Sequence, residues 1–126
     1  MANAHRGEFP IQLDGTEYTL RADYEAVAAI DSQLGSVMDV CLRLVRDGSL
    51  SFREMSVIVC EGIKAHGRAT GNVMQQSANP KRCGEMIFAS GMATCVRPVA
   101  DFLMASLNGG VVPEGNAVDT VKAQTG

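Results

Sequence analysis

Cysteine and histidine are the residue types in this sequence that could hold a metal ion or supply a nucleophile. The cysteines stand at positions 41, 60, 83 and 95, with no Cys-x-x-Cys pair, and the only histidines are His5 and His66. Structural zinc sites use paired ligands at short spacing, which this pattern lacks. An even number of cysteines also allows two disulfides, but each one lies in or beside a helical apolar pattern, where a free thiol packs as a small hydrophobe. We therefore predict four buried free thiols and no metal site.

Groups for acid–base or nucleophilic catalysis are scarce. His66 could act as a base beside a cysteine, but its place after an apolar helical stripe favours a cation near a helix C-terminus. Asp23, Glu25 and Asp31 could form a carboxylate site, although Asp23 suits a helix cap and the other two suit a solvated face. The sequence contains no P-loop, nucleophile elbow or His-Glu-x-x-His motif. We expect a protein that is not an enzyme and uses no cofactor.

Residues 62–84 form a stretch that contains basic residues and no acidic ones. Its cations are Lys64, Arg68, Lys81 and Arg82. They could contact phosphates, but the stretch lacks the interleaved aromatic residues that stack on bases. The net charge of −3 and the pI near 5.3 also argue against nucleic-acid binding. We therefore expect a solvated loop, centred on the turn-rich residues 67–72, and regard a nucleic-acid-binding regulator as the weakest alternative.

Methionine is abundant, with 7 residues against 4 phenylalanines, 2 tyrosines and no tryptophan. Flexible thioether side chains fill gaps in a core, and they also suit surfaces that accept varied apolar partners. Five methionines in the helical part of the chain are candidates for a partner-binding surface: Met55, Met74, Met86, Met92 and Met104. Residue type alone does not distinguish core from binding surface, so both interpretations stay open.

The length of 126 residues and the hydrophobic fraction of 46% predict one globular domain. No run approaches the ~20 apolar residues that cross a bilayer, and the N-terminus lacks the apolar segment of a secretory signal. We expect a cytoplasmic protein with no membrane contact. Residues 1–6 are predicted to be a flexible N-terminus, residues 7–108 a single domain, and the aperiodic residues 109–126 a flexible tail.

The N-terminal region carries the pattern of a β-hairpin. Residues 8–13 and 16–21 alternate apolar and polar side chains, and between them lies Asp14-Gly15, a dipeptide that tolerates the positive φ angles of a tight turn. Pro10 lacks an N–H group and therefore suits an edge strand. A lone hairpin is marginally stable, so its apolar face must rest on the helices that follow.

Five helices are predicted after the hairpin from apolar stripes at three- and four-residue spacing. Capping residues precede four of them: Asp23, Ser36, Ser51 with Glu54, and Asn79 before Pro80. Their stripes comprise Val27, Ile30 and Leu34; Val37, Cys41, Leu44 and Val45; Phe52, Met55, Ile58, Val59, Gly62 and Ile63; Cys83, Met86, Ile87 and Ser90; and Val96, Val99, Leu103, Met104 and Leu107. Because Pro98 interrupts the last stripe, that helix begins near Thr94 or kinks at the proline. The predicted fold is α+β, an N-terminal β-hairpin followed by a bundle of about five mostly short α-helices.

The order of these features resembles the gene transfer agent family of phage-like tail proteins. The resemblance rests on His5-Arg6-Gly7-Glu8, Leu13-Asp14-Gly15, Tyr18-Thr19-Leu20-Arg21, Leu34-Gly35-Ser36, Ser51-Phe-Arg-Glu54 with Gly62, and Val99-Ala-Asp-Phe-Leu-Met-Ala-Ser-Leu107. It covers roughly residues 5–108, and residues 67–82 depart from the shorter, more acidic linker expected there. Members of this family look like tail assembly chaperones of long-tailed phages.

The resemblance implies a non-catalytic protein that binds the tape-measure protein and recruits tail tube subunits during assembly. An apolar groove that takes a helix would suit this work, and the hairpin edge could support strand addition to another copy or to the tube protein. A structural tail component, such as a tube or connector subunit, is the alternative. Tube subunits are built mainly from β-strands, whereas this sequence predicts one hairpin, so the sequence favours the chaperone.

Overall fold

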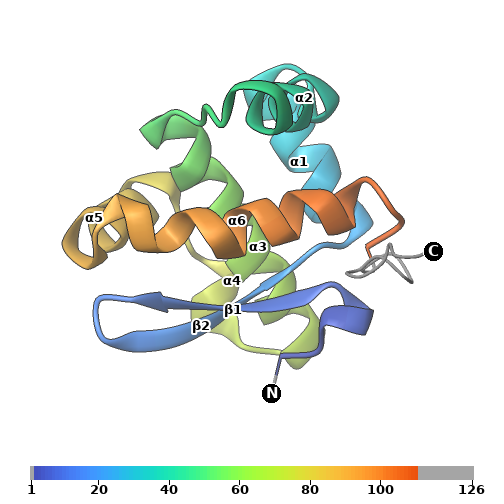
Figure 1. The fold of residues 1–126 in the computed structure, drawn as a ribbon. Coiled ribbons are helices and arrows are strands. Elements are labelled where there is room, and N and C mark those ends of the chain that lie inside the picture. The colour runs from blue at the N-terminus through green and yellow to red at the C-terminus, as the bar shows by residue number, and fades with distance from the viewer. Residues whose placement is uncertain (1, 111–126) are drawn as a thin grey trace.

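The computed structural model describes residues 2–110, and these form the α+β fold that the sequence predicts (Figure 1). A short 3₁₀ helix, Ala4–Arg6, precedes the hairpin strands β1 (Glu8–Leu13) and β2 (Thr16–Arg21). The helices are α1 (Tyr24–Leu34), α2 (Val37–Asp47), α3 (Phe52–Thr70), α4 (Val73–Gln76), α5 (Pro80–Ser90) and α6 (Met92–Ser106). Most of the predicted flexible tail, residues 111–126, lies outside the described residues.

The hairpin is confirmed in its register and in its turn. β1 and β2 pair antiparallel from Glu8 opposite Arg21 to Leu13 opposite Thr16, leaving a two-residue turn. Asp14 and Gly15 have φ angles of 52° and 80°, the positive values that this turn requires. The helices bury the apolar face of the pair except for Tyr18, which is half-buried, as the marginal stability of a lone hairpin demands.

Helix α3 is the centre of the molecule. It packs against β2, α1, α4, α5 and α6, while α6 also crosses β1. Figure 1 shows α3 running through the middle, with α6 lying across it, the hairpin at one end and α2 at the other. The core that results is largely aliphatic, and its largest fully buried side chains include Ile11, Leu20, Ile30, Ile58, Ile87 and Phe102.

The predicted capping residues begin the helices as expected. The side chains of Asp23, Ser36 and Asn79 each accept a hydrogen bond from the backbone N–H three residues ahead. Ser51 and Glu54 form a complete capping box, with distances of 3.0 Å from Glu54 N to Ser51 Oγ and 2.9 Å from Ser51 N to Glu54 Oε1. Local sequence therefore determines where these four helices start.

The predicted loop at residues 67–72 is wrong, because α3 continues through Gly67 to Thr70 and α4 follows two residues later. Gly67 serves close packing rather than a turn. A Cβ at this position would lie 2.8 Å from Gln75 Cβ and 2.9 Å from Gln76 N, so its absence lets α4 fold back onto α3. The sequence signal was ambiguous because glycine marks both turns and close approaches between segments.

Several predicted stripe residues are also misplaced. Val45 and Val96 are 70% and 41% exposed, whereas Val40 and Phe102 occupy the buried positions. The last helix begins at Met92 rather than near Thr94, and Pro98 lies inside it. Short helices with apolar residues on more than one side have no single face that spacing can select, so the neighbouring elements decide which side is buried.

Candidate protein-binding groove

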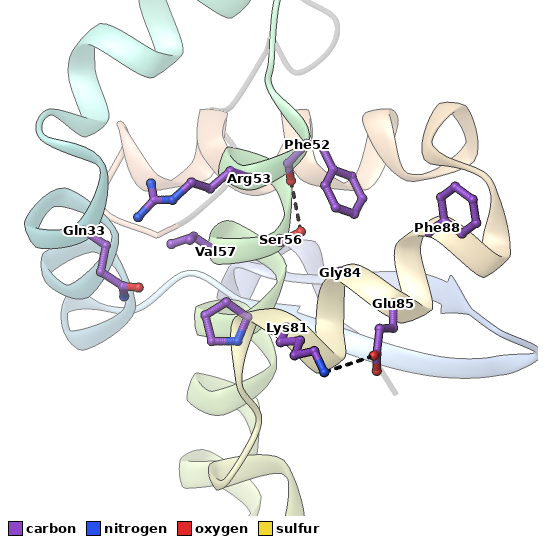
Figure 2. A pocket seen from close by; sticks show the side chains of 10 residues that line it. Gln33, Phe52, Arg53, Ser56, Val57, Lys81, Gly84, Glu85 and Phe88 are labelled. Carbon is purple, nitrogen blue, oxygen red and sulfur yellow. Dashed lines mark hydrogen bonds and ion pairs between the residues drawn. The ribbon is translucent and has the colours of Figure 1, made fainter.

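An apolar groove with a cavity of about 630 Å³ opens between α1, α3 and α5 (Figure 2). Phe52 and Val57 contribute from α3, and Pro80 and Phe88 from α5. Polar side chains lie at its margins: Gln33 on α1, Arg53 on α3, and Lys81 and Glu85 on α5. A concave apolar surface with a polar margin is the usual form of a site that binds an apolar ligand or an amphipathic helix.

Close packing of α3 and α5 forms the floor of the groove. A Cβ on Gly84 would lie 2.9 Å from Ser56 Oγ and 3.4 Å from Phe52 Cζ, so glycine is what lets the two helices approach here. The Ser56 hydroxyl donates a hydrogen bond of 2.9 Å to the Phe52 carbonyl oxygen and is thereby satisfied within α3. The groove floor is consequently apolar to an incoming group.

The two exposed phenylalanines of the described residues, Phe52 and Phe88, both line the groove. Phe88 is 74% exposed and Phe52 is 40% exposed, whereas Phe9 and Phe102 are 5% and 0% exposed. Apolar spacing in the sequence predicts Phe52 on a buried stripe and does not select Phe88, so neither groove ring is predicted as part of a site. The available signal was the position of Phe88 beside the stripe Cys83, Met86 and Ile87 rather than on it.

The charges around the groove are largely engaged, with Arg53 as an exception. Lys81 Nζ lies 3.7 Å from Glu85 Oε2, and the Gln33 amide donates to Glu61 Oε2 at 2.8 Å. Within residues 2–110, Arg53 forms no ion pair and is exposed. A cation on the margin of an apolar groove can attract a partner that carries an acidic residue beside its apolar surface.

The five candidate methionines do not meet on one surface. Met55 and Met86 are buried at 2% and 6% exposure, while Met74 and Met92 are 84% and 41% exposed. Met104 is half-buried against the core. Met74 and Met86 alone come together, in a separate cavity of about 430 Å³ beside α4.

The candidate carboxylates have structural roles, and two of them pair with Arg68 of the basic stretch. Arg68 Nη2 lies 3.4 Å from Asp23 Oδ1, and Arg68 Nε lies 3.2 Å from Glu25 Oε1. Asp31 accepts a hydrogen bond of 2.9 Å from the backbone N–H of Val37. These residues hold the N-termini of α1 and α2, and they link α1 to α3.

His66 lies on α3, four residues before its end at Thr70. Its side chain is half-buried, and Nδ1 has no hydrogen-bond partner within the described part of the chain. The Thr70 hydroxyl donates to the His66 carbonyl oxygen at 2.9 Å, in the last turn of the helix. This position agrees with the interpretation of His66 as a residue near a helix C-terminus.

The four cysteines are free and buried, as predicted. Burial raises the pKa of the Cys41 thiol and the Cys95 thiol. The side-chain hydrogen bond with Cys60, together with burial, raises the pKa of Cys83 far above its ordinary value. The thiols of Cys41, Cys83 and Cys95 are therefore protonated at neutral pH and behave as small apolar side chains, whereas the hydrogen bond with Cys83 lowers the pKa of Cys60.

Two further properties concern residues 2–110 as a whole. No cluster of three or more histidine, cysteine, aspartate or glutamate side chains among them could hold a metal ion. None of the described helices combines the length and the apolar character needed to cross a membrane.

One comparison with known proteins gives a match. A family model described as phage tail tube protein, GTA-gp10, matches residues 6–109, which is nearly the whole described chain. The chain therefore belongs to this family of phage and gene transfer agent tail proteins. The predicted resemblance is confirmed at this level. No curated protein and no solved structure gives a match.

Proposed function

We propose that this protein is a structural component of the tail tube of a phage or gene transfer agent particle. The observation that carries the proposal is the match of residues 6–109 to a family described as a phage tail tube protein. That description favours the structural alternative over the assembly chaperone that the sequence pattern favours. In this role the protein acts by contact with other tail proteins and not by catalysis, and the proposal places this assembly in the cytoplasm.

The groove between α3 and α5 supports a role in protein contact. Exposed aromatic rings over a preformed apolar cavity are typical of the anchors that dominate binding at protein interfaces. Phe52 and Phe88 provide such rings, and close packing at Gly84 holds α3 and α5 together beneath them. The site therefore suits a protein segment with an apolar surface.

A second candidate is a tail assembly chaperone that binds the tape-measure protein and recruits tube subunits. The specific support is the composition of the fold, which contains a single two-stranded sheet among six α-helices in residues 2–110. A groove formed by helices suits an amphipathic helix of a long tape-measure protein, whose apolar stripe would otherwise aggregate. Contact through the hairpin edge with the tube protein belongs to this proposal as well.

Quantitative mass spectrometry of purified particles tests the first proposal against the second. A tube component is expected in the finished particle in a stoichiometry comparable to the other repeated tail proteins. Its absence from finished particles, together with its presence in assembly intermediates, would contradict the structural role and support the chaperone. Co-expression then provides the second measurement, since a chaperone is expected to increase the soluble fraction of the tape-measure protein.

A matched pair of variants connects either function to the groove. Phe88→Ser removes an exposed groove ring, and Tyr24→Ser removes an aromatic ring that is 85% exposed on α1, outside the groove. We expect the first variant to reduce the yield of tailed particles and the second to leave it unchanged. Equal yields in both variants would show that the groove does not take part in tail formation.

A further inference from the structure

Helix α2 has a second apolar stripe that faces solvent. Met38, Leu42 and Val45 are 54%, 55% and 70% exposed. Their spacing of four and three residues places them on one side of the helix, one above the other. The opposite side of α2 is buried against the molecule through Val37, Val40 and Cys41.

The described residues do not cover this stripe. In Figure 1, α2 lies at the end of the molecule remote from the hairpin, where it packs mainly against α1 and α6. Three apolar side chains at positions i, i+4 and i+7 are the anchors that a helix inserts into an apolar groove. The chain thus carries on α2 the kind of helix that its own groove between α3 and α5 is shaped to receive.

The charges beside the two surfaces are complementary. Asp39, in the first turn of α2, forms no ion pair in residues 2–110, and neither does Arg53 at the groove. Arg46 in the last turn of α2 and Glu85 on the α5 side of the groove are already engaged, the first by Asp47 and the second by Lys81 and Arg82. Figure 2 shows Arg53 and Glu85 on opposite sides of the groove, so the orientation of α2 that places Asp39 on the Arg53 side brings the two unpaired charges together.

We propose that α2 of one copy of this protein inserts Met38, Leu42 and Val45 into the α3–α5 groove of a second copy. The two surfaces are different, so each copy in a pair keeps one surface available for a further neighbour. Such a heterologous contact closes into a ring or continues as a helical array. The proposal goes beyond the function given above and holds whether the protein stays in the finished tail or acts only during assembly.

Complementation between two variants of the full chain tests this contact. Leu42→Glu places a charge on the α2 stripe and keeps the groove, whereas Phe88→Glu places a charge in the groove and keeps the stripe. Both side chains are exposed, so folding is expected to be unaffected, which circular dichroism and thermal unfolding can verify. Tyr24→Glu, on an exposed residue outside both surfaces, is the matched control.

Sedimentation velocity and light scattering at increasing concentration provide the readout. We expect the wild-type chain and Tyr24→Glu to self-associate, and each of the other two variants to be monomeric on its own. Their mixture is expected to form a one-to-one dimer that grows no further, because one intact stripe faces one intact groove. The proposal is overturned if the wild-type chain is monomeric throughout or if the mixture stays monomeric. Self-association that persists in both variants also overturns it and points to another surface, such as the hairpin edge.

Charge reversal tests the orientation of α2 in the groove. Asp39→Arg and Arg53→Asp are each expected to weaken self-association about two- to fivefold, the effect of an exposed ion pair. The two changes combined in one chain restore the opposite charges in exchanged positions and are expected to recover most of the loss. If the double variant associates no better than the single variants, Asp39 and Arg53 do not face each other.

Discussion

The two sides of helix α3 differ in how completely they are covered. Toward the hairpin, β2 packs onto α3, and Leu20 and Ile58 are both 0% exposed. Toward α5, the first turn of the same helix leaves Phe52 40% exposed beside the largely exposed ring of Phe88. One helix therefore serves two purposes, since its covered side stabilises the fold and its open side offers an apolar surface to another protein.

The comparison shows that apolar side chains alone do not distinguish core from contact surface. Phe102 and Phe88 are the same residue type on adjacent helices, yet their exposed fractions are 0% and 74%. Burial of Phe102 contributes to the free energy of folding, whereas an exposed Phe88 contributes only when a partner removes it from water. Substitutions on the two sides should consequently separate stability from association.

The largest effect on stability is expected from the covered side. Phe102→Ala removes a fully buried ring and leaves a cavity, and changes of this kind cost about 3–5 kcal/mol. Urea denaturation followed by circular dichroism measures the loss as a lower midpoint at an unchanged slope. A loss below about 1 kcal/mol would mean that the ring is not part of a close-packed core.

Alkaline pH should destabilise the folded chain through three of its four buried thiols. The pKa values of Cys41, Cys83 and Cys95 are raised in the folded state above their ordinary value of 9.0. Above pH 9 the unfolded chain therefore releases protons that the folded chain retains, so stability is present below pH 9 and falls as pH increases. The slope is at most about 1.4 kcal/mol per thiol for each pH unit.

Substitution of these cysteines separates their contribution from that of other groups that titrate in the same range. Denaturation midpoints between pH 8 and pH 10 are compared for the wild-type chain and for Cys41→Ala. The variant is less stable at pH 8 because it loses packing, and its midpoint should fall less steeply with pH. Equal slopes in the two proteins would contradict the assignment to Cys41.

An intermediate effect on stability is expected from a substitution at the N-terminus of α3, where the capping box begins the helix that carries both sides. Ser51→Ala removes one half of the capping box and should cost about 1 kcal/mol. Ser49→Ala, on an exposed serine just before the cap, is the control and is expected to be neutral. Because Phe52 follows the cap directly, Ser51→Ala should also loosen the groove and reduce self-association. Unchanged stability would show that the capping box does not determine where α3 begins.

The smallest effect on stability is expected on the open side. Phe88→Ser removes a ring that is 74% exposed, so the free energy of unfolding should change by less than about 0.5 kcal/mol. Measured in the same denaturation series as Phe102→Ala, it supplies the contrast between the two sides. A destabilisation as large as that of Phe102→Ala would mean that the groove belongs to the core and is not a contact surface.

Much of the local structure could be predicted from the sequence. The dipeptide Asp14-Gly15 determines the hairpin turn, since it tolerates the positive φ angles observed there. Side chains such as Asp23 and Ser51 determine helix starts, because each bonds to a backbone N–H within three residues. These are interactions over short distances along the chain, so neighbouring residues are enough to specify them.

The groove, in contrast, depends on which helices meet. The turn-rich pattern around Gly67 predicts a loop, although this glycine marks the close approach of α4 to α3. Apolar spacing predicts Phe52 on a buried stripe, although this ring lines an open groove. Spacing along one helix shows which residues share a side but not which neighbour covers that side. For this reason the five candidate methionines, which share only their residue type, lie partly in the core and partly on the surface.

The sequence by itself determined the hairpin, the caps and the α+β class, because turns, caps and apolar periodicity are local properties. The tertiary structure decided which apolar side chains remain in water, including Phe88 on α5 and the outer stripe of α2. Exposure is a property of packing between elements that are distant in sequence, so it emerges only when the helices are placed around α3.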